Sequence, residues 1–366
     1  MKLEIYIVIT FITASILASC SSATINYSNE LPLTNKAFKE VDIDKYFRYQ
    51  DFSASSLEDL ERYISNKKLK TNETREAINL RDNIRKILSK KEFTVDLSIS
   101  NIYAFELIEL IYSSNLPIAI QWNQSDEKDI FQHSVTEKIS GFCSSIYEDS
   151  QVAISKKINI LKDLTLIIYM PRYENIQRVL SEQFPKSQNI KFNKEDEQKF
   201  ASKVLEIDQS NQRFNKIISL NPNQKLHFSP RSREDVRNIV LLLEPNEYRS
   251  VLPAFKYHGG EQFKYINFIS SLENLDNVNQ LLDFENSFIP LPFHLSKKIQ
   301  NKEIFFLGDL MELSILNDWL ILEILKQSSI RYARVSGMTG ELEYQRGSCT
   351  KRSIPMQMIN SSWVTS

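Results

Sequence analysis

The sequence predicts an α/β protein in which parallel strands alternate with helices. Two apolar runs, residues 164–170 and 239–243, are too short for interior helices and suit strands that are buried on both faces. Each run is followed by apolar residues at helical spacing, in residues 173–184 and 247–257. Strands separated by helices of this length are joined by right-handed crossovers and form a mainly parallel sheet.

The composition is that of a globular protein with a large core, because the 366 residues are 42% hydrophobic and 25% charged. The 45 basic and 46 acidic side chains give a net charge of -1, which implies no general attraction to nucleic acid. The chain has 7 glycines and contains neither G-x-G-x-x-G nor G-x-x-x-x-G-K-[ST]. The two common Gly-rich phosphate-binding motifs are therefore excluded.

The N-terminus has the features of a bacterial export signal. Lys2 precedes an apolar run at residues 5–17, which is shorter than the roughly 20 residues that span a bilayer. The run ends in Leu17-Ala18-Ser19-Cys20, which resembles a lipobox, so we expect Cys20 to be the lipidated first residue of the mature protein. Ser21 then implies anchoring at the outer membrane, on its periplasmic face. The alternative is an ordinary cleaved signal that contains a cysteine.

Residues 55–92 predict two helices. Ser56-x-x-Asp59 has the capping-box pattern, and Thr71 can cap a second helix, which ends at Lys90-Lys91 with charges that suit its dipole. We expect four parts: a signal peptide at residues 1–19, the lipidated cysteine and a tether at residues 20–54, a helical segment at residues 55–92, and an α/β domain at residues 93–366. Within the last part, the expected strands are residues 93–99, 116–122, 164–170, 190–192, 239–243 and 265–269. The expected helices are residues 103–112, 173–184, 194–207, 204–220, 247–257 and 310–325, and the helix at 204–220 ends at the turn 221–223.

A charged loop that contains Arg231, Arg233 and Asp235 precedes the apolar run at 239–243. One interpretation is a docking or anion-contacting elbow, because arginine forks suit bidentate partners. The other is structural: Asp235 caps the turn before the strand, and an arginine pairs with Asp235 or with Asp208. We favour the structural interpretation.

Three stretches carry a resemblance to known proteins. Asp208, Ser210 and Arg213, followed by Phe228-x-Pro230-Arg231-x-Arg233-x-Asp235, resemble the LppC/LpoA family of outer-membrane lipoproteins, which activate class A penicillin-binding proteins. Asn317-Asp318-Trp319 resembles that family's Asp-Ala-Tyr. The stretch Gly337-Met338-Thr339-Gly340-Glu341-Leu342, with Gly347 and Arg352 behind it, resembles a hairpin near the end of type I periplasmic binding proteins.

The resemblance implies a two-lobed fold of the type I periplasmic-binding-protein class with a reduced first lobe. The lobes would be formed by residues 93–155 with 275–328, and by residues 156–274 with 329–366. It also implies a non-enzymatic protein that binds and stimulates a class A penicillin-binding protein in peptidoglycan synthesis. The alternative is a periplasmic solute-binding lipoprotein for an amino acid or similar small ligand.

The sequence supports no catalytic, metal or cofactor site. His133, His227, His258 and His294 form no metal-binding pattern, and neither C-x-x-C nor G-x-S-x-G occurs. Asp196, Glu234 and Asp235 could form an acid/base pair, but unpaired surface carboxylates explain them better. Cys143 and Cys349 could form a disulfide in an oxidising compartment; two buried free thiols are the interpretation that we favour.

The lipobox is tested by Cys20→Ala. We expect this variant to move to the soluble fraction or to stay unprocessed, because it lacks the thioether that carries the acyl chains. Membrane fractionation and the intact mass of the product measure the outcome. Unchanged fractionation together with an unchanged mass would contradict the lipobox.

Overall fold

The structure is a computed structural model. It describes residues 54–65, 71–98, 104–114, 116–123, 135–220, 227–275, 277–292, 295–296 and 307–360. Cys20, the predicted signal segment and all of the predicted tether except Ala54 lie outside the described residues. Two compact units divide the chain between Arg85 and Lys86. Among the residues described, no helix has the length and apolar character needed to cross a membrane.

The described part of the first unit holds helix α3 (Ala54–Ser65) and most of helix α4 (Thr71–Leu88). Arg85 of α4 forms an ion pair with Glu61 of α3. The side chains of Leu60 and Ile84 are fully buried. The capping-box pattern had predicted Ser56 as the N-cap of this helix. That prediction is wrong, because α3 already begins at Ala54 and Ser56 lies inside it.

In the described part of the second unit, six strands form the main sheet in the order β11-β7-β6-β5-β3-β4. The strands are β3 (Thr165–Tyr169), β4 (Gln188–Lys191), β5 (Asn238–Leu242), β6 (Lys264–Asn267), β7 (Ser287–Pro290) and β11 (Met356–Met358). All neighbours pair in parallel except β11 with β7. Every residue of β5 is buried, as expected for a central strand with both faces covered. The predicted α/β class with a parallel sheet is confirmed.

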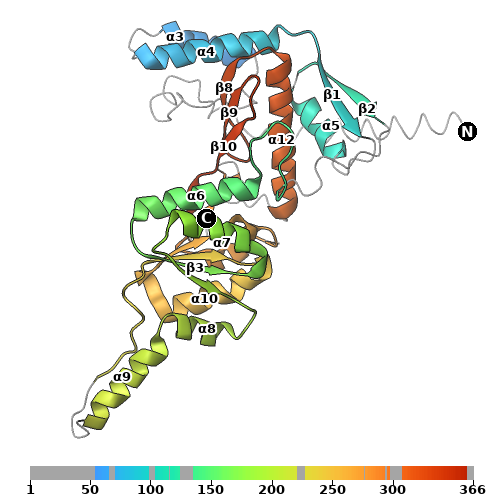
Figure 1. Ribbon diagram of the computed structural model, residues 1–366. Helices are drawn as coiled ribbons and strands as arrows, with labels where there is room; N and C mark the ends of the chain where they lie inside the picture. The colour runs from blue at the N-terminus through green and yellow to red at the C-terminus, as the bar shows by residue number, and fades with distance from the viewer. Residues whose placement is uncertain are drawn as a thin grey trace, which may run out of the picture. The chain divides into compact units, whose positions relative to one another are not determined.

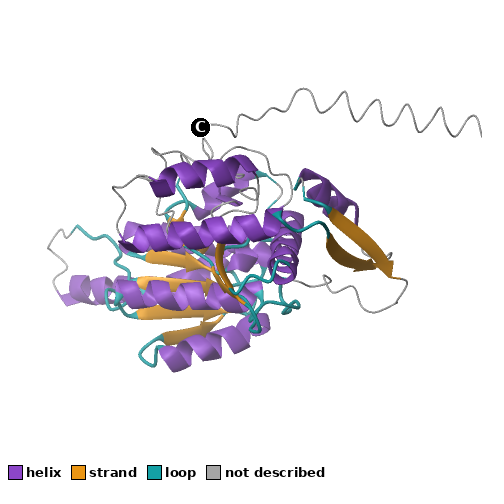
Figure 2. Cartoon of the chain, turned by 90° about the horizontal axis from the view of Figure 1, so that it is seen from above, coloured by secondary structure: helices purple, strands orange, loops and turns teal. Residues whose placement is uncertain are grey.

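Helices cover both faces of this sheet (Figure 2). The chain moves from β3 to β4 through α7 (Glu174–Gln183), then crosses back to β5 and on to β6 through α8 (Glu197–Val204) and α10 (Tyr248–Gly259). Right-handed crossovers in opposite directions put α7 on one face and the other two helices on the opposite face. Contacts between α8 and α10, and between α7 and α6 (Ile146–Leu161), agree with this assignment.

Helix α6 had no counterpart among the predicted elements. Its N-terminus is a complete capping box: the Ser145 hydroxyl accepts the backbone N–H of Glu148 at 3.2 Å, and the Glu148 carboxylate accepts the N–H of Ser145 at 2.8 Å. The Ser145-x-x-Glu148 pattern was therefore a usable signal in the sequence.

The predicted helices at 194–207 and at 204–220 correspond to two separate helices. Helix α8 ends at Val204, and α9 (Ile207–Leu220) starts after Glu206, whose φ of 59° is left-handed. A non-glycine residue in this conformation interrupts the helical hydrogen bonding and changes the chain direction. The two helices consequently have different axes.

Two smaller sheets complete the second unit. Strands β1 (Phe93–Ser98) and β2 (Ile118–Asn123) are parallel and flank α5 (Ala104–Ser113) in the chain. Strands β8 (Tyr332–Ser336), β9 (Glu341–Gln345) and β10 (Lys351–Ser353) are antiparallel. The long helix α12 (Leu307–Gln327) joins both regions, because the Gln327 side-chain amide exchanges hydrogen bonds of 2.9 and 2.6 Å with the backbone of Thr94 in β1.

The strand partners differ from the expected lobe boundaries at two places. Strand β7, expected in the first lobe, continues the main sheet next to β6. Strands β8–β10, expected in the second lobe, form a sheet of their own. The apolar Pro-containing segment around β7 gave no strand prediction, since its prolines interrupt the pattern of a strand.

Candidate functional site

The predicted charged loop lies between α9 and β5 and makes contacts inside the fold. Arg233 forms a bidentate ion pair with Asp235, with Nε–Oδ1 and Nη2–Oδ2 distances of 2.8 and 2.6 Å. Its Nη2 also donates to Gln188 Oε1 at 2.7 Å, and its backbone N–H donates to the carbonyl of Leu205 at 2.9 Å. The hydrogen bonds from Arg233 hold the pKa of Asp235 below its usual range. Arg233 and Asp235 therefore have the structural role.

Arg231 differs from Arg233, two residues away. Its side chain is exposed, and its backbone N–H donates to the hydroxyl of Ser210 at 3.0 Å. The carboxylate of Asp208, the other acid considered as a partner, accepts from the Ser202 hydroxyl at 3.3 Å. The loop thus contains one arginine that is paired with a carboxylate of the same loop and one arginine whose side chain is exposed.

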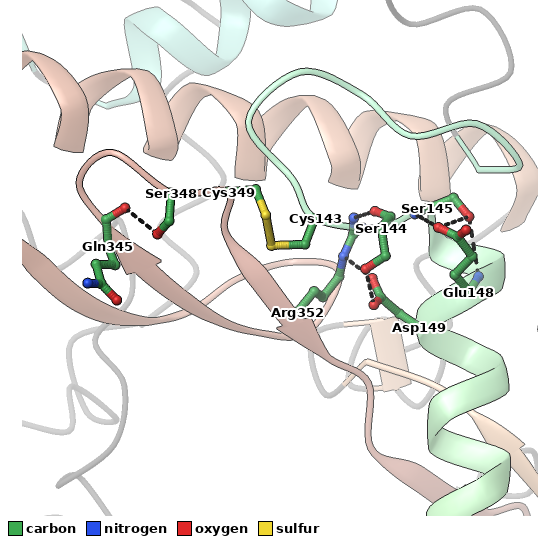
Figure 3. The surroundings of a disulfide bond; sticks show 9 residues. All are labelled: Cys143, Ser144, Ser145, Glu148, Asp149, Gln345, Ser348, Cys349 and Arg352. Atoms are coloured by element: carbon green, nitrogen blue, oxygen red, sulfur yellow. Dashed lines mark hydrogen bonds and ion pairs between the residues drawn. A yellow bond between two sulfur atoms is a disulfide. The ribbon is translucent and has the colours of Figure 1, made fainter.

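Cys143 and Cys349 form a disulfide, so the favoured interpretation of two free thiols was wrong (Figure 3). Their Cα atoms are 4.8 Å apart, although 206 positions separate them in the chain. The backbone brings them together: Thr350 donates its N–H to Gly141 and accepts the N–H of Cys143, at 2.8 and 2.9 Å. Sequence spacing carries no information on this pairing.

Beside the disulfide, Arg352 of β10 is buried against the start of α6 (Figure 3). Its Nε lies 3.0 Å from Oδ2 of Asp149, and the two side chains are 2% and 7% exposed. Oδ1 of Asp149 accepts from the Ser144 hydroxyl at 2.5 Å. The guanidinium also lies over the ring of Phe142, 4.4 Å from its centroid, in a cation–π contact.

The same arginine connects to a second buried carboxylate. Arg352 Nη1 donates to the Thr339 hydroxyl at 3.1 Å, and that hydroxyl donates to Asp318 Oδ2 at 2.5 Å. Asp318, in α12, also accepts the backbone N–H groups of Met338 and Thr339 at 2.6 and 2.8 Å. A Cβ at Gly337 would lie 2.6 Å from Asp318 Oδ1, so only glycine fits at this position.

Burial dominates the electrostatics of this network. It raises the pKa of Asp149 and raises that of Asp318 to about 6, while the hydrogen bonds and Arg352 oppose the shift. It lowers the pKa of Arg352, against the attraction of both carboxylates. These groups are enclosed and engaged with each other, so the network holds α6, α12 and the β8–β10 sheet together and is not an acid/base site. Among the described residues, no group of three His, Cys, Asp or Glu could hold a metal ion.

A second polar cluster lies at the carboxyl ends of β3 and β6. The Tyr147 hydroxyl donates to Glu273, and the Tyr147 ring contacts that of Phe268 at 4.8 Å, edge to face. Tyr173 packs on Phe268 at 5.5 Å, and Arg172 lies 5.7 Å from the Tyr173 ring centroid. Burial raises the pKa of the Glu273 carboxyl.

The position of this cluster is chemically significant. From β3 the chain goes to β4 on one side, and β5 then lies on the other side of β3, so the strand order reverses between β3 and β5. In open α/β sheets, ligands bind at the carboxyl ends of strands at such a switch point. Among the described residues, the buried hydroxyls of Tyr173 and Ser271 have no hydrogen-bond partner. They could bind a polar ligand group.

Two pockets lie at the opposite, amino-terminal edge of the sheet. One has a volume of about 470 Å³ and lies next to the start of β3, with Lys162, Asp163 and Thr165 in its wall. The other has a volume of about 710 Å³ and lies near the starts of β6 and β7, with Lys256 and Tyr265 in its wall. Lys256 donates to the carbonyls of Asp283 and Glu285 at 3.0 and 2.5 Å, so its ammonium group is held by the backbone in the wall of this pocket.

Comparison with solved structures gives likenesses of fold. No family model matches the chain, and no curated protein matches it. The fold is similar to the crystal structure of an extracellular ligand-binding receptor from Verminephrobacter eiseniae ef01-2, with a TM-score of 0.35 and 8% sequence identity. The match covers 74% of this chain and 79% of that chain. A likeness at this level carries no inference about a ligand or a partner.

Separate alanine variants distinguish the two arginines of the loop. Arg233→Ala removes a bidentate pair and leaves Gln188 without its donor, so we expect a loss of about 1–2 kcal/mol in the free energy of unfolding. Arg231→Ala removes an exposed side chain and should change that energy by less than about 0.5 kcal/mol. Urea denaturation measures both. Equal losses would contradict the division of roles.

The buried carboxylate predicts a pH effect that Asp318→Asn removes. Burial raises the pKa of Asp318 from 3.8 to about 6, so the folded protein binds this proton more tightly than the unfolded chain does. The stabilising contribution is complete below pH 4 and is lost as the pH rises to about 6, a change of roughly 3 kcal/mol. Urea denaturation across this interval should show the native protein losing stability relative to Asp318→Asn. A difference that stays constant with pH would exclude this titration.

Proposed function

We propose that this protein is a non-enzymatic, lipid-anchored protein on the periplasmic face of the outer membrane that binds and stimulates a class A penicillin-binding protein. One observation carries the proposal: residues from separate stretches of the resemblance contact each other. Asp318 accepts two hydrogen bonds from Thr339, whose hydroxyl accepts from Arg352. A chance match to the two short patterns that contain Asp318 and Thr339 would not require their polar residues to meet in one buried network.

The stretch around Asp208 supports the proposal in the same way. Ser210 holds the backbone of Arg231, and Arg233 pairs with Asp235. The spacing of these residues thus has a structural reason, because each one positions another member of the pattern. This is what we expect of a pattern that specifies a framework.

The proposed activity is allosteric and needs no catalytic group in this chain. A protein that binds the active conformation of a synthase more tightly than the inactive one raises the population of the active form. Two buried carboxyl groups, those of Asp149 and Asp318, are engaged in the internal network. The function therefore depends on the surface of the domain.

A second candidate is a solute-binding protein for an amino acid or similar small ligand. The unpartnered hydroxyls of Tyr173 and Ser271 at the switch point of the sheet favour it. In that case a ligand would contact these hydroxyls, and a change that removes only one hydroxyl would weaken binding.

Binding and thermal-shift measurements on the mature protein decide between the candidates. With a purified class A penicillin-binding protein from the same source, we expect complex formation and faster glycan polymerisation. With a panel of amino acids, we expect no shift in the melting temperature. Tyr173→Phe is the matched variant, because it removes a single oxygen from the second site. No complex, together with an amino-acid shift that Tyr173→Phe abolishes, would replace the first candidate with the second.

A further inference from the structure

Helix α9 and the segment that returns from it form an arm, which we define as residues 211–220 and 227–231. The helix begins after the left-handed Glu206 that ends α8 and leads away from the main sheet (Figure 1). No residue in either described range is buried. The arm therefore contributes almost nothing to the core of the domain.

The arm is nevertheless held in a defined conformation. The rings of Phe214 in α9 and Phe228 in the returning segment are stacked, with centroids 3.9 Å apart and an interplanar angle of 8°. Nearer the body, the Ser210 hydroxyl accepts the backbone N–H of Arg231 at 3.0 Å. These two contacts fix the helix to the returning segment, so its side chains are presented in one arrangement.

Apolar side chains on the arm face solvent. Ile217 and Leu220 are 53% and 82% exposed, and Phe228 is 36% exposed. Ile217 and Leu220 are three residues apart in α9 and share one face of the helix. Exposed apolar side chains that lie together on one helix face are typical of a protein-binding surface.

The charge of the arm is one-sided, although that of the chain is balanced. Between Asp208 and Glu234, the basic residues of the sequence are Arg213, Lys216, Lys225, Arg231 and Arg233, and there is no aspartate or glutamate from position 209 to 233. Arg233 is paired with Asp235, whereas the exposed Arg231 forms no ion pair with any residue that the structure describes. The arm thus combines an apolar face with unbalanced positive charge.

We propose that the arm docks on an acidic face of the protein partner, with Ile217 and Leu220 in an apolar recess and the basic residues around it. The inference rests on the proposed function for the identity of that partner, a class A penicillin-binding protein. Complementary charge speeds association and fixes the orientation, while the desolvated apolar centre gives most of the affinity. Arginine and phenylalanine are also enriched at protein interfaces.

An anionic membrane is the other surface with matching charge, and the arm fits it less well. A helix that lies in the lipid interface needs a broad apolar face. In α9, the ring of Phe214 is covered by Phe228, which leaves Ile217 and Leu220 as the exposed apolar residues of the helix. The remaining positions are largely asparagine, glutamine and serine, so the helix lacks the broad apolar face that lies in a lipid interface.

A triple charge reversal tests the inference: Arg213→Glu, Lys216→Glu and Arg231→Glu in the mature chain. All forms carry Cys20→Ala, so that no lipid anchor hides membrane binding. The matched control is Lys156→Glu, Lys186→Glu and Lys191→Glu, which makes the same change in net charge at three exposed lysines outside the arm. Ile217→Ser with Leu220→Ser tests the apolar centre. Thermal unfolding verifies that every form is folded.

We expect the triple reversal to weaken binding to the purified penicillin-binding protein by about tenfold or more and to reduce its salt dependence, with the control unchanged. The apolar variant should weaken binding without changing the salt dependence. Equal binding by all forms overturns the proposal that the arm is the docking surface and leaves the proposed function intact. If the triple reversal weakens binding to phosphatidylglycerol vesicles but not to the penicillin-binding protein, the arm binds the membrane and the proposal is overturned. No binding even by the unreversed chain overturns both.

Discussion

The guanidinium of Arg352 is the group on which the arrangement of the second unit depends. A buried arginine is costly unless its donors are satisfied and its charge is paired. Here the partners come from three directions: Asp149 at the start of α6, Thr339 in the β8–β9 hairpin and, through Thr339, Asp318 in α12. Removing any one of them leaves a buried charge or donor unmatched. Three elements far apart in the sequence are therefore stable only together.

The disulfide next to this network acts on a different state of the protein. The ion pairs favour one native arrangement, whereas a bond between Cys143 and Cys349 restricts the unfolded chain. For a separation of 206 residues, the chain-entropy account gives a stabilisation of about 5 kcal/mol. The two contributions meet at one place, since Phe142 stacks on Arg352 and Ser144 binds both Arg352 and Asp149. The fold is thus stabilised in this small region both by the ion pair of Arg352 with Asp149 and by the disulfide.

The sequence predicted what depends on local pattern and missed what depends on distant contacts. Strands β3 and β5 are continuous apolar runs, and the β8–β9 hairpin has its glycines at the turn, so both were found. The pairing of Asp149 with Arg352, and the disulfide, join positions some 200 residues apart, and no local signal reports them. Strand β7 was missed because its pairing with β6 and β11, and not its own sequence, makes it a strand. Helix α6 was also missed, although in this case the sequence does contain a local signal, the capping box of Ser145 and Glu148.

Arg231 and Arg233 show why a resemblance identifies a framework more readily than a function. They lie two residues apart in one motif, yet Arg233 is fixed by Asp235 and Gln188, whereas the side chain of Arg231 is exposed. A framework contact constrains residue type at both ends, so it produces a recognisable pattern. An exposed docking residue needs only the right charge near the right place, which leaves many sequences equally suitable. The surface that meets a partner is therefore expected beside the motif, where the constraints of packing end.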